Sequence, residues 1–242
     1  MKFKKLRTQP AKDLAARITN VPQTAVDIGC GPGNSTRILR DVFPEAAILG
    51  IDSSPNMIER AERENPDLSF RLCEATELRE KYDLVFSNAC LQWIPNHETL
   101  IPSLMEKLTD GGTFAAQMPM NSEEPLYRLI DEIVSESEWG FENMRLPNNR
   151  TLTVRKYYDI LSYCSSAFDI WETKYYHILP NCHALVEWVK GTKLRPYLDF
   201  LGEKRGAELE REIEERAKPL YPPTTDGNIM FGFRRLFIIA HK

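Results

Sequence analysis

Short apolar runs alternate with amphipathic stretches along the first half of the chain. Runs rich in Val, Ile, Leu and Phe predict buried strands, and they lie at 24–28, 46–52, 68–73, 82–87 and 113–119. Apolar residues recur at helical spacing in the neighbouring stretches, at 8–20, 34–43, 53–65 and 97–108. Strands that alternate with helices are typical of a parallel sheet with both faces covered.

Residues suited to begin a helix stand at the start of these stretches. Thr8 and Asn34 are expected caps, and Ser54 is a cap followed by Pro55 at the first helical position. These signals support the helical interpretation of the periodic stretches.

The second half of the chain changes character. Helices are expected at 124–138, 153–163, 181–191 and 203–218, and a loop at 139–152. Two long β-prone runs, at 167–179 and 229–242, enclose the last two of these helices. This order predicts an antiparallel edge pair of strands that carries a helical insertion, and the charge run at 203–216 predicts a solvated helix face.

Composition narrows the class of protein. The chain has 242 residues, 42% of them hydrophobic, and a net charge of −4. An acidic balance does not favour nucleic acid as a partner, because binding phosphates requires a basic face. No run has the length of a membrane span or signal peptide, and neither the five cysteines nor the four histidines show metal-ligand spacing. We therefore expect a cytoplasmic protein with reduced thiols and no metal.

The stretch "DIGCGPGNST" carries the strongest chemical signal. A buried strand runs into Asp27-x-Gly29-x-Gly31-x-Gly33 and then into a helix. Glycines allow a tight turn and a close approach of the backbone to a ligand. The dinucleotide fingerprint G-x-G-x-x-G is not matched, because Asn34 stands where its third glycine would be.

Acidic residues at the strand ends indicate what this turn would bind. Asp27 would repel a pyrophosphate but would suit a ligand with a cationic amino-acid tail. Asp52, at the end of the second strand, can accept both hydroxyls of a ribose, and Glu74 is placed for an adenine end. S-adenosylmethionine combines these features.

Several longer motifs carry a family resemblance. "VDIGCGPGNST", "GIDSSPNMI", "SNACLQWIP" and "GGTFAAQMP" resemble class I S-adenosylmethionine-dependent methyltransferases. "DIWETKYYHILP", "EWVKGTKLRPYL" and "RRLFIIA" are similar to the trans-aconitate 2-methyltransferase family within that class. The resemblance covers nearly the whole chain. It implies a single Rossmann-like domain over 1–242 with a mostly parallel seven-stranded sheet, a core at 21–120, and substrate-side cap elements at 121–152 and 180–228.

The resemblance also implies which residues hold the cofactor. Besides the turn and strand-end residues named above, the matching positions are Ser53, Met57, Ala75, Asn88 and Trp93. The product of the cofactor would be S-adenosylhomocysteine.

The same resemblance implies methyl transfer to a carboxylate of trans-aconitate. A carboxylic acid has a pKa of roughly 4, so the nucleophile is ionised at neutral pH and no catalytic base is expected. Catalysis would then consist of in-line positioning in a dry pocket. Candidate substrate residues are Gln92, Tyr175, Tyr176, His177, Arg195 and Arg235, of which Tyr175 and His177 share one strand face and Tyr176 takes the other.

Three alternatives remain open at this stage. The first is a methyltransferase for another small acid or for an oxygen or nitrogen nucleophile. The second is a non-catalytic S-adenosylmethionine-binding protein. The family usually carries a Trp and then a Tyr upstream of the part that matches "KFKKLRTQPA", and these residues, which help close over the cofactor, are not in this sequence. The third is a nicotinamide-linked dehydrogenase, against which Asp27 and the missing third glycine argue.

Overall fold

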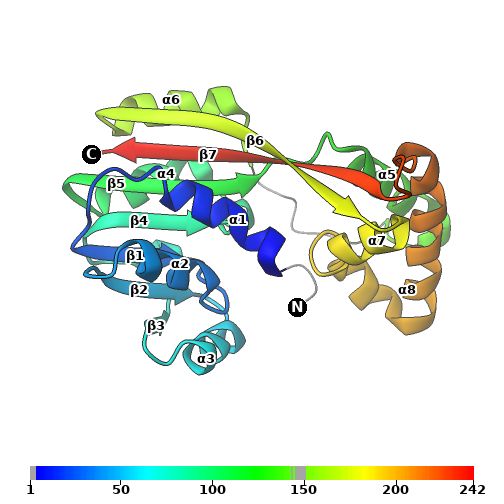
Figure 1. Cartoon of the computed structure of the whole chain (residues 1–242), viewed down its shortest axis with the longest axis horizontal. Helices are drawn as coiled ribbons and strands as arrows, with labels where there is room; N and C mark the ends of the chain where they lie inside the picture. Colours follow the sequence, from blue (N-terminus) through cyan, green and yellow to red (C-terminus); the bar gives the residue numbers. More distant parts are fainter. Residues whose placement is uncertain (1–3, 143, 145–150) are drawn as a thin grey trace. The chain divides into compact units, whose positions relative to one another are not determined.

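The computed structural model describes residues 4–142, 144 and 151–242, and seven strands in this part of the chain form one sheet (Figure 1). The strand order is β3-β2-β1-β4-β5-β7-β6. The strands are β1 (Thr24–Ile28), β2 (Ala47–Asp52), β3 (Ser69–Leu72), β4 (Tyr82–Asn88), β5 (Leu108–Pro119), β6 (Ala167–Leu179) and β7 (Ile229–His241). The first five strands pair in parallel, and β7 pairs antiparallel to β5. This confirms the predicted Rossmann-like fold class.

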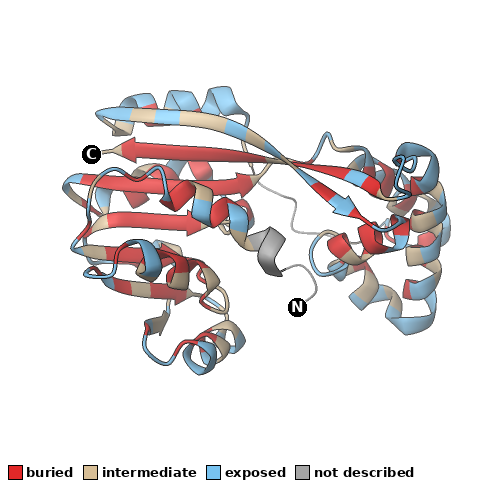
Figure 2. Cartoon of the chain, in the orientation of Figure 1, coloured by how far each residue is buried: buried red, intermediate tan, exposed pale blue. Residues whose placement is uncertain are grey.

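The burial of the strands follows their positions in the sheet. Strands β1 and β4 and residues 112–118 of β5 are mostly buried, as expected for parallel strands covered on both faces (Figure 2). Strand β6 lies at the edge, where exposed and partly buried residues alternate along its length. β6 and β7 run in opposite directions, and both match the ranges expected from the sequence to within one residue (Figure 1).

Helices connect the strands and cover the sheet. The α-helices are α1 (Lys4–Ala15), α2 (Asn34–Val42), α3 (Pro55–Glu64), α4 (His97–Glu106), α5 (Pro125–Val134), α6 (Val154–Cys164), α7 (Cys182–Lys190) and α8 (Arg195–Ala217). Short 3-10 helices are η1 (Ala75–Glu77), η2 (Leu91–Trp93), η3 (Ser137–Trp139) and η4 (Lys218–Leu220). No helix in the described ranges is long and apolar enough to span a membrane.

Three details of the helix prediction were wrong. Helix α1 covers Lys4–Ala15 and not the expected 8–20, so Thr8 lies inside it and does not cap it. Gly33, not Asn34, caps α2, because its left-handed backbone (φ 82°) turns the chain out of the glycine motif. Helix α8 begins at Arg195 and is kinked at Gly202 (φ 71°), whereas the sequence predicted only the part after the kink.

The chain divides into two compact units. The first unit comprises Met1–Pro119, Asn148–Thr173 and Arg235–Lys242, and the second comprises Met120–Pro147 and Lys174–Arg234. The predicted loop at 139–152 lies partly outside the described residues.

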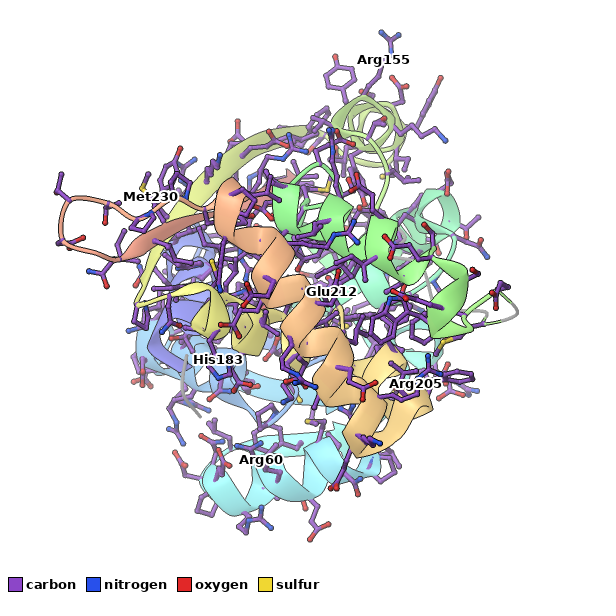
Figure 3. All side chains as sticks on the ribbon, turned by 90° about the vertical axis from the view of Figure 1, so that its right-hand side faces the viewer. Arg60, Arg155, His183, Arg205, Glu212 and Met230 are labelled. Atoms are coloured by element: carbon purple, nitrogen blue, oxygen red, sulfur yellow. The ribbon has the colours of Figure 1, made fainter. Side chains whose placement is uncertain are left out.

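The second unit has an aromatic interior. Phe231 and Phe233 pack edge-on at 5.7 Å between ring centroids, and Trp188 contacts both rings. Helix α8 turns a stripe of Gly206, Leu209, Ile213 and Ala217 inward, while charged side chains such as Arg205 and Glu212 lie on the same helix (Figure 3). The charge run is therefore the solvated face of an amphipathic helix, as predicted.

Candidate active site

The glycine turn after β1 has the backbone that its sequence predicts. Gly29, Gly31 and Gly33 all have positive φ angles, of 67°, 54° and 82°. A Cβ on Gly29 would collide with the Cβ and Sγ of Cys90, whereas one on Gly31 would meet nothing within 4 Å. Gly29 thus allows close packing inside the protein, and Gly31 leaves open space of the kind that a ligand in contact with the backbone needs.

Asp27 holds the turn from beneath. It has no exposed surface, and its Oδ2 accepts hydrogen bonds from the hydroxyls of Ser35 (2.6 Å) and Thr36 (2.7 Å). Among the described residues its Oδ1 has no hydrogen-bond partner. Burial raises the pKa of this carboxyl to about 6, against the effect of the two hydroxyls, and the Asp52 charge adds to the rise. The structure therefore places Asp27 under the turn, and its direct contact with a ligand stays a prediction.

Asp52 connects the turn to the next strand. Its Oδ2 accepts a hydrogen bond from the Gly31 amide, and its Oδ1 accepts one from the Ser54 amide, both at 2.9 Å. One carboxylate at the end of β2 thus fixes the glycine turn and the N-terminus of α3 together. This is the position at which Rossmann-like proteins hold a ribose.

A cavity of about 850 Å³ opens beside these groups. Such a volume lies in the usual range for small-molecule sites. Six residues predicted to bind the cofactor line it: Gly29, Asp52, Ser53, Glu74, Ala75 and Trp93. The charged lining residues are Asp52 and Glu74, and both are acidic. An acidic lining favours a cationic ligand over a pyrophosphate.

The remaining predicted cofactor residues do not line this cavity. Asp27 lies beneath the turn, Gly31 bonds Asp52 through its amide, and Gly33 caps α2. Met57 is partly buried in α3, and Asn88 ends β4.

The segment after β4 has a strained backbone. Ala89 has a φ of 54°, which is unusual for a residue with a side chain, and its amide donates to the Gln117 carbonyl at 2.8 Å. Gln92 is 4% exposed and donates from Nε2 to the Ala89 carbonyl at 2.7 Å. Cys90 lines the cavity, and burial raises its pKa to about 12, which disfavours the thiolate that a nucleophilic cysteine needs.

A buried hydrogen-bonded chain joins Arg235 to Asn88 through Gln117, a residue that the sequence did not single out. Arg235 donates from Nη1 to the Gln117 Oε1 at 2.9 Å, and Gln117 donates from Nε2 to the Asn88 Oδ1 at 2.7 Å. Gln117 is fully buried and Arg235 is 7% exposed. In the sequence, Gln117 could have been noticed as the one amide side chain in the apolar strand "TFAAQMP".

A second buried network supports the segment before α4. His97, the first residue of α4, is 1% exposed. Its Nε2 lies 2.8 Å from the Leu91 carbonyl, which can only accept, so Nε2 carries the proton and Nδ1 accepts from the Tyr157 hydroxyl at 2.7 Å. The Tyr157 oxygen accepts in turn from the Leu152 amide at 3.0 Å. The polar atoms of His97 and Tyr157 therefore all have hydrogen-bond partners within the protein, and the pair has a structural role.

The other predicted substrate residues belong to the second unit. His177 is 5% exposed and packs on Trp188 at 4.4 Å, whereas Tyr176 is 57% exposed and Tyr175 is half-buried. The predicted alternation of Tyr175 and His177 against Tyr176 is thus present. The Arg195 side chain is 70% exposed and lies 3.7 Å from Asp199, one helical turn on. Their contact with a substrate stays a prediction.

Comparisons with known proteins define the class. A family profile described as "Methyltransferase domain" matches residues 21–181. The fold is similar to the YcgJ protein from Bacillus subtilis, with a TM-score of 0.64 and 14% identity over 96% of this chain and 98% of that one. It is also similar to phosphoethanolamine N-methyltransferase 2 from Haemonchus contortus, with a TM-score of 0.59 and 18% identity over 98% of this chain and 52% of that one. At these identities the solved structures show the fold alone.

The chain therefore belongs to this family of methyltransferases, enzymes of the class that uses S-adenosylmethionine as methyl donor. Two curated relatives are more similar to this chain in sequence than these solved structures are. The trans-aconitate 2-methyltransferase of Methylobacterium nodulans is 41% identical over 100% of this chain and 96% of its own length. That of Variovorax paradoxus is 40% identical over 98% of this chain and 93% of its own length. The predicted family, enzyme class and cofactor are confirmed.

Proposed function

We propose that this enzyme transfers the methyl group of S-adenosylmethionine to a carboxylate of trans-aconitate and forms a methyl ester. The observation that carries the proposal is the likeness to relatives of that name over the full chain, at 38–41% identity.

The residues of the first unit fit the cofactor. The open space at Gly31 and the unpartnered Oδ1 of buried Asp27 suit a ligand with a cationic tail near the turn. Asp52 would hold the ribose, and Glu74 and Ala75 would contact the adenine end of the cavity. When bound, S-adenosylmethionine supplies an electrophilic methyl group on a positively charged sulfur.

The lining chemistry suits a nucleophile that needs no activation. Among the described lining residues no histidine or lysine is present, and burial disfavours the thiolate of Cys90 by raising its pKa. A carboxylate substrate is already ionised at neutral pH and loses no proton when it attacks a methyl group. The chain would therefore act by positioning the two reactants and excluding water, which can lower a barrier by roughly 7–11 kcal/mol in favourable cases.

Arg235 is our first choice for a substrate contact in the first unit. A guanidinium donates two parallel hydrogen bonds to a carboxylate, and burial strengthens such pairs. Gln92 is a second candidate in the first unit. In the second unit, the candidates for a substrate contact are Arg195, Tyr175, Tyr176 and His177.

The test is a product analysis. Purified enzyme with S-adenosylmethionine and trans-aconitate should yield a monomethyl ester detected by mass spectrometry, and citrate and other small acids should react much more slowly. Asp52→Asn should lower turnover strongly, whereas Asp67→Asn, at an exposed ion pair of the same unit, should not. If the wild type methylates another acid in the panel and leaves trans-aconitate unchanged, the substrate assignment is wrong.

A further inference from the structure

Gln117 lies between two of the proposed site residues on one face of the sheet. It pairs directly with Asn88 across β4 and β5, and Arg235 is opposite Pro119, two residues along the same strand. Directly paired residues, and residues two apart on one strand, point to the same face. The contacts Arg235 to Gln117 to Asn88 therefore follow from the register of three adjacent strands.

The charge at one end of this chain fixes the direction of every hydrogen bond in it. A guanidinium has only donors, so Gln117 must present its Oε1 to Arg235. Its Nε2 must then face Asn88 and donate, and Asn88 must accept through Oδ1. The Nδ2 donors of Asn88 are consequently turned away from Gln117.

The location of Asn88 makes this orientation relevant to ligands. Asn88 is the last residue of β4 and half-buried, and Cys90, two residues on, lines the cavity. The strand order reverses between β1 and β4, and ligands of such sheets bind outside the carboxyl ends of the strands at that point. A side-chain N–H of Asn88 held at this point can donate to an acceptor atom of a bound ligand. The strongest acceptor that the proposed reactants offer is a carboxylate oxygen.

We propose that Asn88 donates a side-chain N–H hydrogen bond to a carboxylate oxygen of a bound reactant, and that Gln117 is the positioning residue that keeps Asn88 in this orientation. The proposal rests on the proposed function. The carboxylate has two sources, the amino-acid tail of the cofactor and the substrate acid, and the experiment separates them.

Gln117→Glu reverses the orientation without changing the size of the side chain. The new carboxylate would accept from Arg235 as an ion pair and could not donate, so Asn88 would turn its amide and donate to it. Asn88 would then present an oxygen to the reactant carboxylate. Because a hydrogen bond to a charged group is lost and two oxygens face each other, we expect affinity to fall about 10- to 100-fold.

Calorimetric titrations and kinetics identify the affected reactant. If the cofactor tail is bound, Gln117→Glu weakens binding of S-adenosylhomocysteine and leaves that of 5′-methylthioadenosine, which lacks the tail, unchanged. If the substrate acid is bound, KM for trans-aconitate rises in Gln117→Glu and also in Asn88→Asp, which leaves the contact between Gln117 and Arg235 in place, while both nucleosides bind as in the wild type. A purely structural role of Gln117 would weaken the two nucleosides equally.

Two further variants keep the test decisive. Thr113→Val, on the same strand, removes a buried hydrogen bond to Asn20 (2.9 Å) and should lower stability without changing this selectivity. If Gln117→Glu does not fold, Asn88→Asp accepts from Gln117 in the same way but presents an anionic oxygen, and it should show the same selective loss. Unchanged titrations and an unchanged KM in a folded variant overturn the proposal. If the wild type does not methylate trans-aconitate, the proposed substrate fails, and the selectivity between the two nucleosides alone decides this inference.

Discussion

The two units differ in how many polar side chains they bury. In the second unit the buried polar residues among those described are Asn121 and His177, and the interior is formed by aromatic rings around Trp188. The first unit buries many more polar groups. Among them, Asp27, Gln92 and Gln117 lie close to the carboxyl ends of parallel strands, and Arg235 is opposite Pro119 at the end of β5. Every lining residue of the cavity also belongs to the first unit. The cavity therefore lies in the unit whose interior holds more buried polar side chains, and both units bury aromatic rings.

The largest expected effect is on the first unit at Gly29. Gly29→Ala should abolish cofactor binding, because the new Cβ collides with Cys90 and the φ of 67° is strained. We expect the free energy of cofactor binding to become less favourable by about 4 kcal/mol or more. Calorimetric titration with S-adenosylhomocysteine measures it. The matched control is Gly227→Ala in the second unit, with a φ of 82° and open space around it, which should cost only about 1 kcal/mol of stability. If Gly29→Ala and Gly227→Ala weakened cofactor binding equally, close packing at Gly29 would not explain the loss.

In the second unit, Trp188→Ala should act on stability alone. The side chain is 3% exposed and contacts His177, Phe231 and Phe233. Its removal should lower the free energy of unfolding by about 3–5 kcal/mol, as measured with urea. Affinity of the folded variant for S-adenosylhomocysteine should stay within a few-fold of wild type. A large loss of affinity would show that the cavity depends on the aromatic interior.

Asp27→Asn should change the pH dependence of stability. The pKa of Asp27 is raised by burial from 3.8 to about 6, so its contribution to stability is present below pH 3.8 and is lost as the pH rises through 6. This loss amounts to about 3 kcal/mol. Unfolding curves between pH 4 and pH 7 should show that the variant gains stability relative to wild type as the pH rises. A difference that does not vary with pH would contradict the raised pKa.

The smallest effect is expected for Tyr157→Phe. This change leaves His97 Nδ1 and the Leu152 amide without the hydroxyl that each bonds, at a cost of about 1–2 kcal/mol of stability. Affinity for the cofactor should be unchanged, because this network supports the first unit without lining the cavity. Differential scanning calorimetry together with the same titration checks both statements. Weaker binding at unchanged stability would place Tyr157 in the site.

Local sequence signals predicted the parts of the fold that depend on local physics. The glycine turn, Asp52 at the end of β2 and the alternation along β6 follow from backbone freedom and strand period, and each was visible in the sequence. The start of α1 was missed because Thr8 was expected to cap it, whereas the helix begins at Lys4 and contains Thr8. The kinked first part of α8 was missed because Gly202 interrupts its pattern.

The candidate site was predictable only where its residues are close in sequence. Gln117 contacts Asn88 across 29 positions and Arg235 across 118, so its role depends on strand order and register. The burial of His97 likewise depends on Tyr157, which lies 60 residues away. Asp27 was predicted to contact a ligand, and the structure adds that it is enclosed beneath the turn by Ser35 and Thr36.

The most direct test of the account is a calorimetric titration of the full chain with S-adenosylmethionine. We propose that the carboxyl edge of the first unit binds this cationic nucleoside through Asp52 and the glycine turn. We predict binding of one molecule per chain, at least tenfold weaker in Asp52→Asn and unchanged in Asp67→Asn. No binding by the wild type, or full affinity in a folded Asp52→Asn variant, would contradict it.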